Sequence, residues 1–280
     1  VRREGGVLFV NAGSVGRPEG DKRATYAILR FANGRVRAEH RLVEYDIGRS
    51  AEAIRKEKLP EGYIDVITKA ASLDTLKNRH AKKATDKEII DSALALAKEC
   101  KYEQQHTHQV ERLAKSIFGQ LGKLHKIGEA EGFLLRCAAI LHDIGWLEGR
   151  KAHHKTALRL IMDSPQLRLD FERRRIVGLA ARYHRKALPK EKHSYFCDLN
   201  AKDRSIVRRL AGILRVADGL DRSHENRVKD IRCEVDRERV KMICHSGEPL
   251  DGEFALAAEK GTLFEQVFGR KLVFERGACR

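Results

Sequence analysis

The chain has 280 residues, of which 42% are hydrophobic and 34% charged, and its formal net charge at pH 7 is +16. Its apolar runs all fall short of the ~20 residues of a membrane-spanning helix, which argues against a membrane protein. The positive charge is spread out without a long basic tail, so it favours phosphate-bearing partners over a dedicated DNA-binding arm, with a merely solvated basic surface as the alternative.

The first part of the chain is predicted to be β-rich. Asn33 and Gly34 separate two strand-like runs, and this dipeptide is a strong signal for a tight hairpin turn. A short helix over residues 51–58 should follow, because Pro60 cannot continue it. So few strands cannot enclose a core of their own. The predicted strands are residues 7–10, 24–31 and 36–43.

Two blocks in this part resemble the C-terminal end of small calcineurin-like metallophosphoesterases. They are Asn11-Ala12-Gly13-Ser14-Val15-Gly16-Arg17-Pro18 and Gly20-Asp21-Lys22-Arg23-Ala24-Thr25-Tyr26-Ala27, and Ala12 departs from that family's usual N-P-G-S-V-G. The blocks that carry that family's metal ligands, ending in Gly-His-Thr-His, do not occur in the chain. The resemblance therefore implies a truncated metallophosphoesterase segment over residues 1–69, to which we assign no activity, and then a linker over 70–83.

From residue 84 the pattern is helical, and several predicted helices carry a histidine or an aspartate on their apolar face. Any single buried histidine is more often a satisfied core residue than a ligand, but five helices repeat the feature. Burying these polar groups is costly unless a partner compensates them, and a divalent metal would do so. The first predicted helix begins near residue 86, and the next two cover 104–122 and 129–147. The fourth begins near 153, and the last two lie around 177–184 and 210–221.

The inward-facing groups centre on an adjacent His-Asp pair in the apolar run 133–147. In the fourth helix His154 continues the apolar stripe better than His153, which remains an alternative. The full set is His106, His142, Asp143, His154, His184 and Asp218.

The hydrophobic pattern changes again over residues 228–280. Residues 231–235 and 240–244 alternate like a hairpin, a helix over 253–260 follows, and residues 272–274 are strand-like. We therefore expect a small α+β extension after a helical domain over 84–227.

The order H…HD…H…H…D resembles the HD superfamily of metal-dependent phosphohydrolases. The local sequences resemble more specifically the C-terminal HD-like domain of the exopolyphosphatase and guanosine pentaphosphatase family, over about residues 84–275. This resemblance implies a mainly α fold, an HD-type helical bundle. The matching motifs are Leu141-His142-Asp143-Ile144-Gly145, His153-His154-Lys155, Ala181-Arg182-Tyr183-His184-Arg185-Lys186, Leu214-Arg215-Val216-Ala217-Asp218-Gly219-Leu220-Asp221-Arg222-Ser223 and Lys260-Gly261-Thr262-Leu263-Phe264-Glu265.

The resemblance implies two divalent metal ions. The first would be held by His106, His142, Asp143 and Asp218, and the second would share Asp143 and take His154 and His184. Mixed nitrogen and oxygen ligands suit Mn, Fe, Zn or Co, and Mg less well. Such a pair of ions would activate a bridging water as the nucleophile, with Asp143 and His142 as the central catalytic residues.

Five basic side chains near these groups are candidates for binding substrate phosphate, although each taken singly could be a solvated helix-end charge. We expect a metal-dependent phosphohydrolase that acts on a nucleotide-like or polyphosphate-like substrate. The alternative is a non-catalytic module that binds polyphosphate or an alarmone, because in the family that the chain resembles the chemistry belongs to an actin-like ATPase-fold domain with no counterpart here. The five are Lys155, Arg182, Arg185, Lys186 and Arg222.

Nucleic acid is a less favoured partner, because a single-strand groove needs exposed stacking aromatics and aromatic residues make up only 6% of the chain. The six cysteines show no CxxC motif and no pairing pattern, which is typical of reduced thiols in a cytoplasmic protein. The sequence does not indicate an oligomeric state.

Overall fold

The structure is a computed structural model that describes residues 2–4, 7–13, 21–57, 62–70, 84–149, 152–193 and 195–278. The chain divides into two units, Val1–Lys83 and Ala84–Arg280, each with its own cluster of buried apolar side chains. Residues 14–18 and 20 of the metallophosphoesterase-like blocks, and residues 71–83 of the expected linker, lie outside the described residues.

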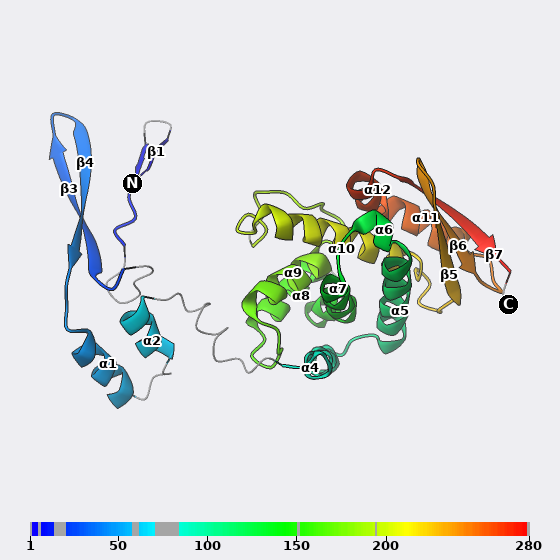
Figure 1. Ribbon diagram of the computed structural model, residues 1–280, viewed down its shortest axis with the longest axis horizontal. Helices are drawn as coiled ribbons and strands as arrows, with labels where there is room; N and C mark the ends of the chain where they lie inside the picture. Colours follow the sequence, from blue (N-terminus) through cyan, green and yellow to red (C-terminus); the bar gives the residue numbers. More distant parts are fainter. Residues whose placement is uncertain are drawn as a thin grey trace. The chain divides into compact units, whose positions relative to one another are not determined.

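In its described residues, the first unit contains two hairpins and two helices (Figure 1). Asn33 and Gly34 have φ angles of 49° and 70° and join the paired residues Ala32 and Arg35, which confirms the predicted two-residue turn. The helix expected over 51–58 begins earlier, because the side chain of Asp46 caps it by accepting a hydrogen bond from the backbone of Arg49. The elements are β1 (Arg2–Glu4), β2 (Val7–Phe9), β3 (Ala24–Ala32), β4 (Arg35–Val43), α1 (Ile47–Lys56) and α2 (Gly62–Lys69).

The second unit is mainly α, as predicted. Its first helix begins at Asp86 and is capped by Thr85 through a capping box with Glu88. The single helix expected over 129–147 is broken: an α-helix ends at Leu141 and a 3-10 helix, η1, begins at Ile144. The helices are α4 (Asp86–Glu99), α5 (Gln104–Gln120), α6 (Gly122–His125), α7 (Glu129–Leu141), η1 (Ile144–Glu148), α8 (His153–Asp163), α9 (Phe171–Arg182) and α10 (Ala201–Gly219).

Helix α10 is the centre of this unit. It is buried without interruption from Leu210 to Gly219, and it contacts α5, α7 and α9 as well as the two helices of the C-terminal extension. A helix that is buried all round must be covered by several neighbours. Its C-terminal end is therefore brought to the interior of the bundle.

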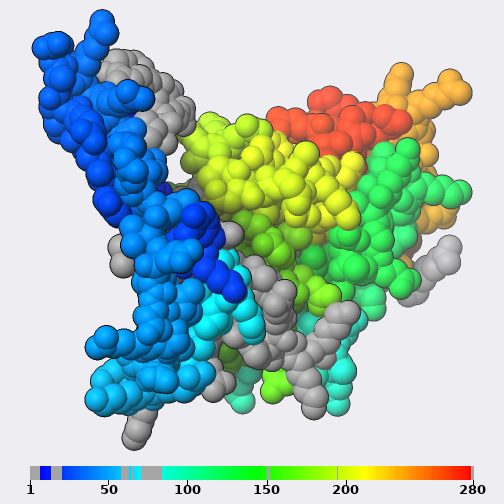
Figure 2. All heavy atoms as spheres, turned by 60° about the vertical axis from the view of Figure 1, so that its left-hand side comes forward, coloured from blue at the N-terminus to red at the C-terminus, as the bar shows by residue number. Residues whose placement is uncertain are grey.

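The C-terminal extension forms a three-stranded sheet with two helices and packs against α10 (Figures 1 and 2). The predicted hairpin is confirmed, and the last strand runs parallel to the second through a helical crossover. Val240 and Phe264 belong to the same buried cluster as the helical bundle, so the extension shares its core. Its elements are β5 (Asp230–Val235), β6 (Arg239–His245), α11 (Asp251–Lys260), α12 (Thr262–Phe268) and β7 (Lys271–Gly277).

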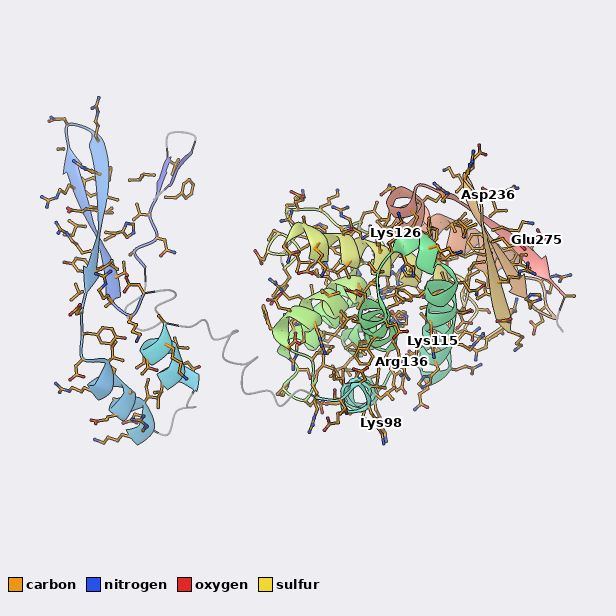
Figure 3. All side chains as sticks on the ribbon, viewed as in Figure 1. Lys98, Lys115, Lys126, Arg136, Asp236 and Glu275 are labelled. Atoms are coloured by element: carbon orange, nitrogen blue, oxygen red, sulfur yellow. The ribbon has the colours of Figure 1, made fainter. Side chains whose placement is uncertain are left out.

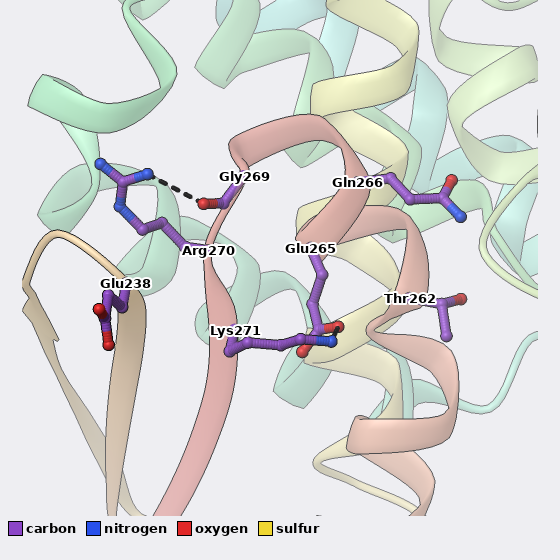
Figure 4. A pocket seen from close by; sticks show the side chains of 7 residues that line it. All are labelled: Glu238, Thr262, Glu265, Gln266, Gly269, Arg270 and Lys271. Atoms are coloured by element: carbon purple, nitrogen blue, oxygen red, sulfur yellow. Dashed lines mark hydrogen bonds and ion pairs between the residues drawn. The ribbon is translucent and has the colours of Figure 1, made fainter.

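Charged side chains such as Lys98, Lys115 and Arg136 project outward from the second unit (Figure 3). A surface pocket of about 420 Å³ lies on the extension (Figure 4), and it mixes both signs of charge, with Lys271 paired to Glu265 at 2.8 Å.

In the described part of the chain, no helix is both long and apolar enough to span a membrane. The expected cytoplasmic location stays a prediction.

Candidate metal centre

Four histidines and two aspartates from five helices meet in the interior of the second unit. His106 lies in the first turn of α5, His153 is the first residue of α8, and Asp218 lies in the last turn of α10. His142 and Asp143 directly follow α7, and His184 follows the end of α9. The four histidines are each at most 1% exposed, so their imidazoles contact one another and the two carboxylates instead of water.

Asp143 lies between two pairs of imidazoles. Its Oδ1 is 3.2 Å from Nε2 of His153 and 3.3 Å from Nε2 of His184. Its Oδ2 is 3.6 Å from Nε2 of His142 and 4.0 Å from Nε2 of His106. Although Oδ1 is fully buried, no group among the described residues makes a hydrogen bond to it. A buried carboxylate oxygen without such a partner is costly, and here it faces nitrogen atoms that are good metal ligands.

Hydrogen bonds on the far side of the rings orient three of the histidines. Nδ1 of His142 is 2.7 Å from the carbonyl of Ala139, and Nδ1 of His184 is 2.6 Å from the carbonyl of Ala181. A carbonyl can only accept, so in these two rings Nδ1 carries the proton and Nε2 turns a lone pair toward the cluster.

The third of these histidines is held by a carboxylate instead. Nδ1 of His106 is 2.8 Å from Oδ2 of Asp221, and Oδ1 of this fully buried carboxylate accepts a hydrogen bond from the backbone of Asn226. Such outer partners are the usual means of orienting metal-binding imidazoles. Asp221 belongs to one of the motifs that carry the family resemblance, but the sequence assigned it no role.

The structure brings His153, not His154, to Asp143. Both side chains are buried, but only His153 has an atom among the groups that could hold a metal in the described part of the chain. The preference for His154 over its alternative is therefore not supported. Helical periodicity favoured His154 because it continues the apolar stripe, but periodicity does not show which of the two adjacent histidines reaches Asp143.

Two neighbours of His153 position its side chain. A Cβ atom at Gly145 would lie 1.9 Å from the carbonyl oxygen of His153, so only glycine allows η1 to approach the start of α8 this closely. The indole of Trp146 stacks on the His153 ring at 4.9 Å between centroids. These contacts aim His153 at the cluster.

Asp218 joins the cluster from α10. Its Oδ1 is 3.3 Å from Nε2 of His106 and 3.9 Å from Nε2 of His142. Its Oδ2 forms an ion pair with the ammonium of Lys260, the last residue of α11. No role for the Lys260 side chain was predicted, because nothing in the sequence shows that the extension reaches α10.

The charges of the cluster are strongly coupled. Burial lowers the pKa of His184 to about 3. Burial also lowers the pKa of His106, but the carboxylates of Asp218 and Asp221 outweigh burial and raise it to about 10. Burial raises the pKa of Asp143, and the imidazoles of His142, His153 and His184 lower it by more, so this carboxylate is ionised. Lys260 and then His106 likewise hold the pKa of Asp218 well below its usual range against the opposing effect of burial.

The predicted phosphate-binding residues fall into two groups. Nη1 of Arg185 is 3.3 Å from Nε2 of His153, so this guanidinium touches the cluster. Burial, then His153, Arg185, Arg182 and Lys186 lower the pKa of His154 to about 4. Lys155 is exposed, and Arg222 lines a separate surface pocket with Ser223 and Arg227.

The residues fit a metal centre with two positions that share one ligand. His106, His142 and Asp143 form one group of close ligand atoms, and Asp143, His153 and His184 form the other. Burial lowers the pKa values of His142 and His184, so these imidazoles are in the neutral form that metals require, and the carboxylates of Asp143 and Asp218 are ionised. His106, whose pKa the carboxylates of Asp218 and Asp221 raise, would have to release its proton when a metal binds. Oδ1 of Asp143, which has no hydrogen-bond partner among the described residues, is the atom that a metal would satisfy.

A comparison with protein families finds a match in the second unit. The family described as Ppx/GppA phosphatase, domain III, matches residues 90–257, more than half of the chain. This range includes all six residues of the cluster and ends before Lys260. No curated protein matches the chain. Because the match covers most of the helical unit, the chain belongs to the Ppx/GppA phosphatase family through its domain III.

Proposed function

We propose that the chain is a metal-dependent phosphohydrolase of the HD type that cleaves a phosphate ester or phosphoanhydride. The observation that carries this proposal is the buried Oδ1 of Asp143, which lies between His153 and His184 with no hydrogen-bond partner among the described residues. A nucleotide-like or polyphosphate-like substrate agrees with the family and with the net charge of +16.

Two ions would be held by ligands already in place. One would take His106, His142, Asp143 and Asp218, and the other would share Asp143 and take His153 and His184. Nitrogen and oxygen donors suit Mn, Fe, Zn or Co better than Mg. When bound, the ions would supply Lewis acidity and an activated water.

Side chains of the protein would orient the candidate ligands and bind the substrate phosphate in this reaction. The hydrogen bonds from Nδ1 of His142 and His184 hold both rings with Nε2 inward, so little reorganisation is needed at the reacting centre. Arg185 touches the cluster and would bind a non-bridging phosphate oxygen, where its charge stabilises the transition state.

The test compares wild type with Asp143→Asn, which keeps the shape of the side chain and removes its charge. We expect about two transition-metal ions per wild-type chain by elemental analysis, their loss in the variant, and loss of hydrolysis of generic phosphate esters in parallel. Asp163→Asn is a matched control, because Asp163 lies at the end of α8 and its side chain is 63% exposed. Hydrolysis that survives in Asp143→Asn would refute the central role of this carboxylate.

The competing function is a non-catalytic module that binds a phosphate-rich anion. The basic side chains around His154 favour it, because they could bind an anion without any metal. This alternative predicts polyphosphate binding that survives chelation, with no turnover. Asp143→Asn would then leave anion affinity unchanged, whereas Arg185→Ala would weaken it.

A further inference from the structure

Lys260 is a cation from the C-terminal extension that enters the cluster of histidines and aspartates. Its ammonium pairs with Oδ2 of Asp218, and its side chain is only 15% exposed. The other oxygen of Asp218 faces His106 and His142. The carboxylate thus turns one oxygen to the lysine and the other to the imidazoles.

The backbone at Lys260 is held in place by a buried arginine. Arg215 donates from Nε to the carbonyl of Lys260 at 2.7 Å and from Nη1 to the carbonyl of Tyr183 at 3.0 Å. Tyr183 directly precedes His184, so one guanidinium ties the end of α11 to the segment that carries a candidate ligand. A buried guanidinium keeps such carbonyl contacts because losing them would leave its charge unsolvated.

Close packing fixes the same helix a turn earlier. A Cβ atom at Gly219 would lie 2.5 Å from Cα of Ala257, so α11 lies directly against the end of α10 one residue after Asp218. The stem of Lys260 therefore starts from a rigid position, and little side-chain entropy remains to be lost when its ammonium meets Asp218.

We propose that Lys260 is a positioning residue of the metal centre, which occupies Oδ2 of Asp218 and leaves Oδ1 as the single oxygen offered to a metal. A carboxylate with both oxygens free can rotate or bind an ion through both, whereas one held by a charged hydrogen bond presents a fixed single ligand atom. The extension is then part of the active centre, not an appendage. This inference rests on the proposed function, because it requires that a metal binds beside Asp218.

The experiment titrates Co²⁺ into the full chain and three variants. Lys260→Met removes the ammonium and keeps an unbranched stem, and Lys260→Arg keeps a charged donor. The control is Lys271→Met, because Lys271 belongs to the same extension, is 79% exposed and pairs with Glu265 at the surface. Visible absorption reports the coordination of Co²⁺, and the single tryptophan, Trp146, reports on the His153 side through its stacking on that ring.

In wild type we expect two ions, only one of which changes the fluorescence of Trp146. Lys260→Met should weaken the other ion about tenfold or more and change its absorption spectrum, while the fluorescence midpoint stays in place. Lys260→Arg and Lys271→Met should behave like wild type. Should Lys260→Met fail to fold, Lys260→Gln replaces it, and weaker binding in Lys260→Gln than in Lys260→Arg supports the proposal.

Three results would overturn the inference. Unchanged affinity for both ions in the folded Met or Gln variant means that Lys260 does not position Asp218, and tighter binding means that it competes with the metal. Either result leaves the proposed function intact. A wild-type chain that takes up no ion refutes the proposed function and this inference together.

Discussion

Replacing Gly145 with alanine tests whether the close approach of η1 to α8 is what places His153 beside Asp143. The added Cβ would start 1.9 Å from the carbonyl oxygen of His153, and real Cβ contacts lie beyond 3.0 Å. The two segments must therefore separate by about 1 Å, because the clash is with backbone that no side-chain rotation can relieve.

A shift of about 1 Å is larger than the tolerance of metal–ligand distances. Metal–ligand distances are set to within about 0.2 Å, so the ion shared by Asp143, His153 and His184 should be lost or strongly weakened. We also expect the free energy of unfolding to fall by about 1–3 kcal/mol, as for other overpacked sites.

The assay follows metal uptake by the fluorescence of Trp146 and stability by urea unfolding. Gly119→Ala is the matched control: Gly119 lies within α5, a Cβ there meets nothing within 4 Å, and alanine is the better helix former. If Gly145→Ala kept wild-type metal affinity and stability, the argument that this glycine positions His153 would be wrong.

Two further predictions concern the charges of the cluster. Asp221→Ala removes the buried acceptor of the His106 Nδ1 proton and of the Asn226 amide, so metal affinity on that side should fall about 10–100-fold and the free energy of unfolding by about 1–3 kcal/mol. Calorimetric titration and urea unfolding measure both, and an Asp221→Ala chain with unchanged metal affinity would exclude an orienting role for Asp221. The second prediction is a pH dependence of the chelator-treated chain. Burial lowers the pKa of His184 to about 3 from an unfolded value near 6.5, so the unfolded state binds more protons between these values, and stability should be lost as the pH falls from about 6.5 toward 3. Each pKa unit is worth about 1.4 kcal/mol, and urea unfolding of His184→Gln at several pH values should show a shallower loss than wild type. Equal slopes in the two proteins would contradict this assignment.

Local pattern alone predicted much of the architecture. The Asn33-Gly34 turn depends on backbone preferences of two adjacent residues, and the helices around His106 and Asp218 depend on a repeat of 3.6 residues, so both were readable without tertiary contacts. The same periodicity showed that these polar side chains lie on buried faces, which is the signal that pointed to a metal centre. The helix expected over 129–147 shows the limit of this signal: its apolar run continues, but the backbone leaves the α-helix at His142.

Only the tertiary structure decided which groups meet. Periodicity favoured His154 over its neighbour His153, but which of the two reaches Asp143 depends on how closely Gly145 approaches α8. Asp221 lies 115 residues after its partner His106, and Lys260 lies 42 residues after its partner Asp218. A local sequence repeat cannot indicate contacts between residues so far apart in the chain. The sequence by itself therefore determined most of the elements, their buried faces and most of the candidate ligands. The residues that position those ligands were decided by tertiary packing, because they come from segments that are distant in the chain.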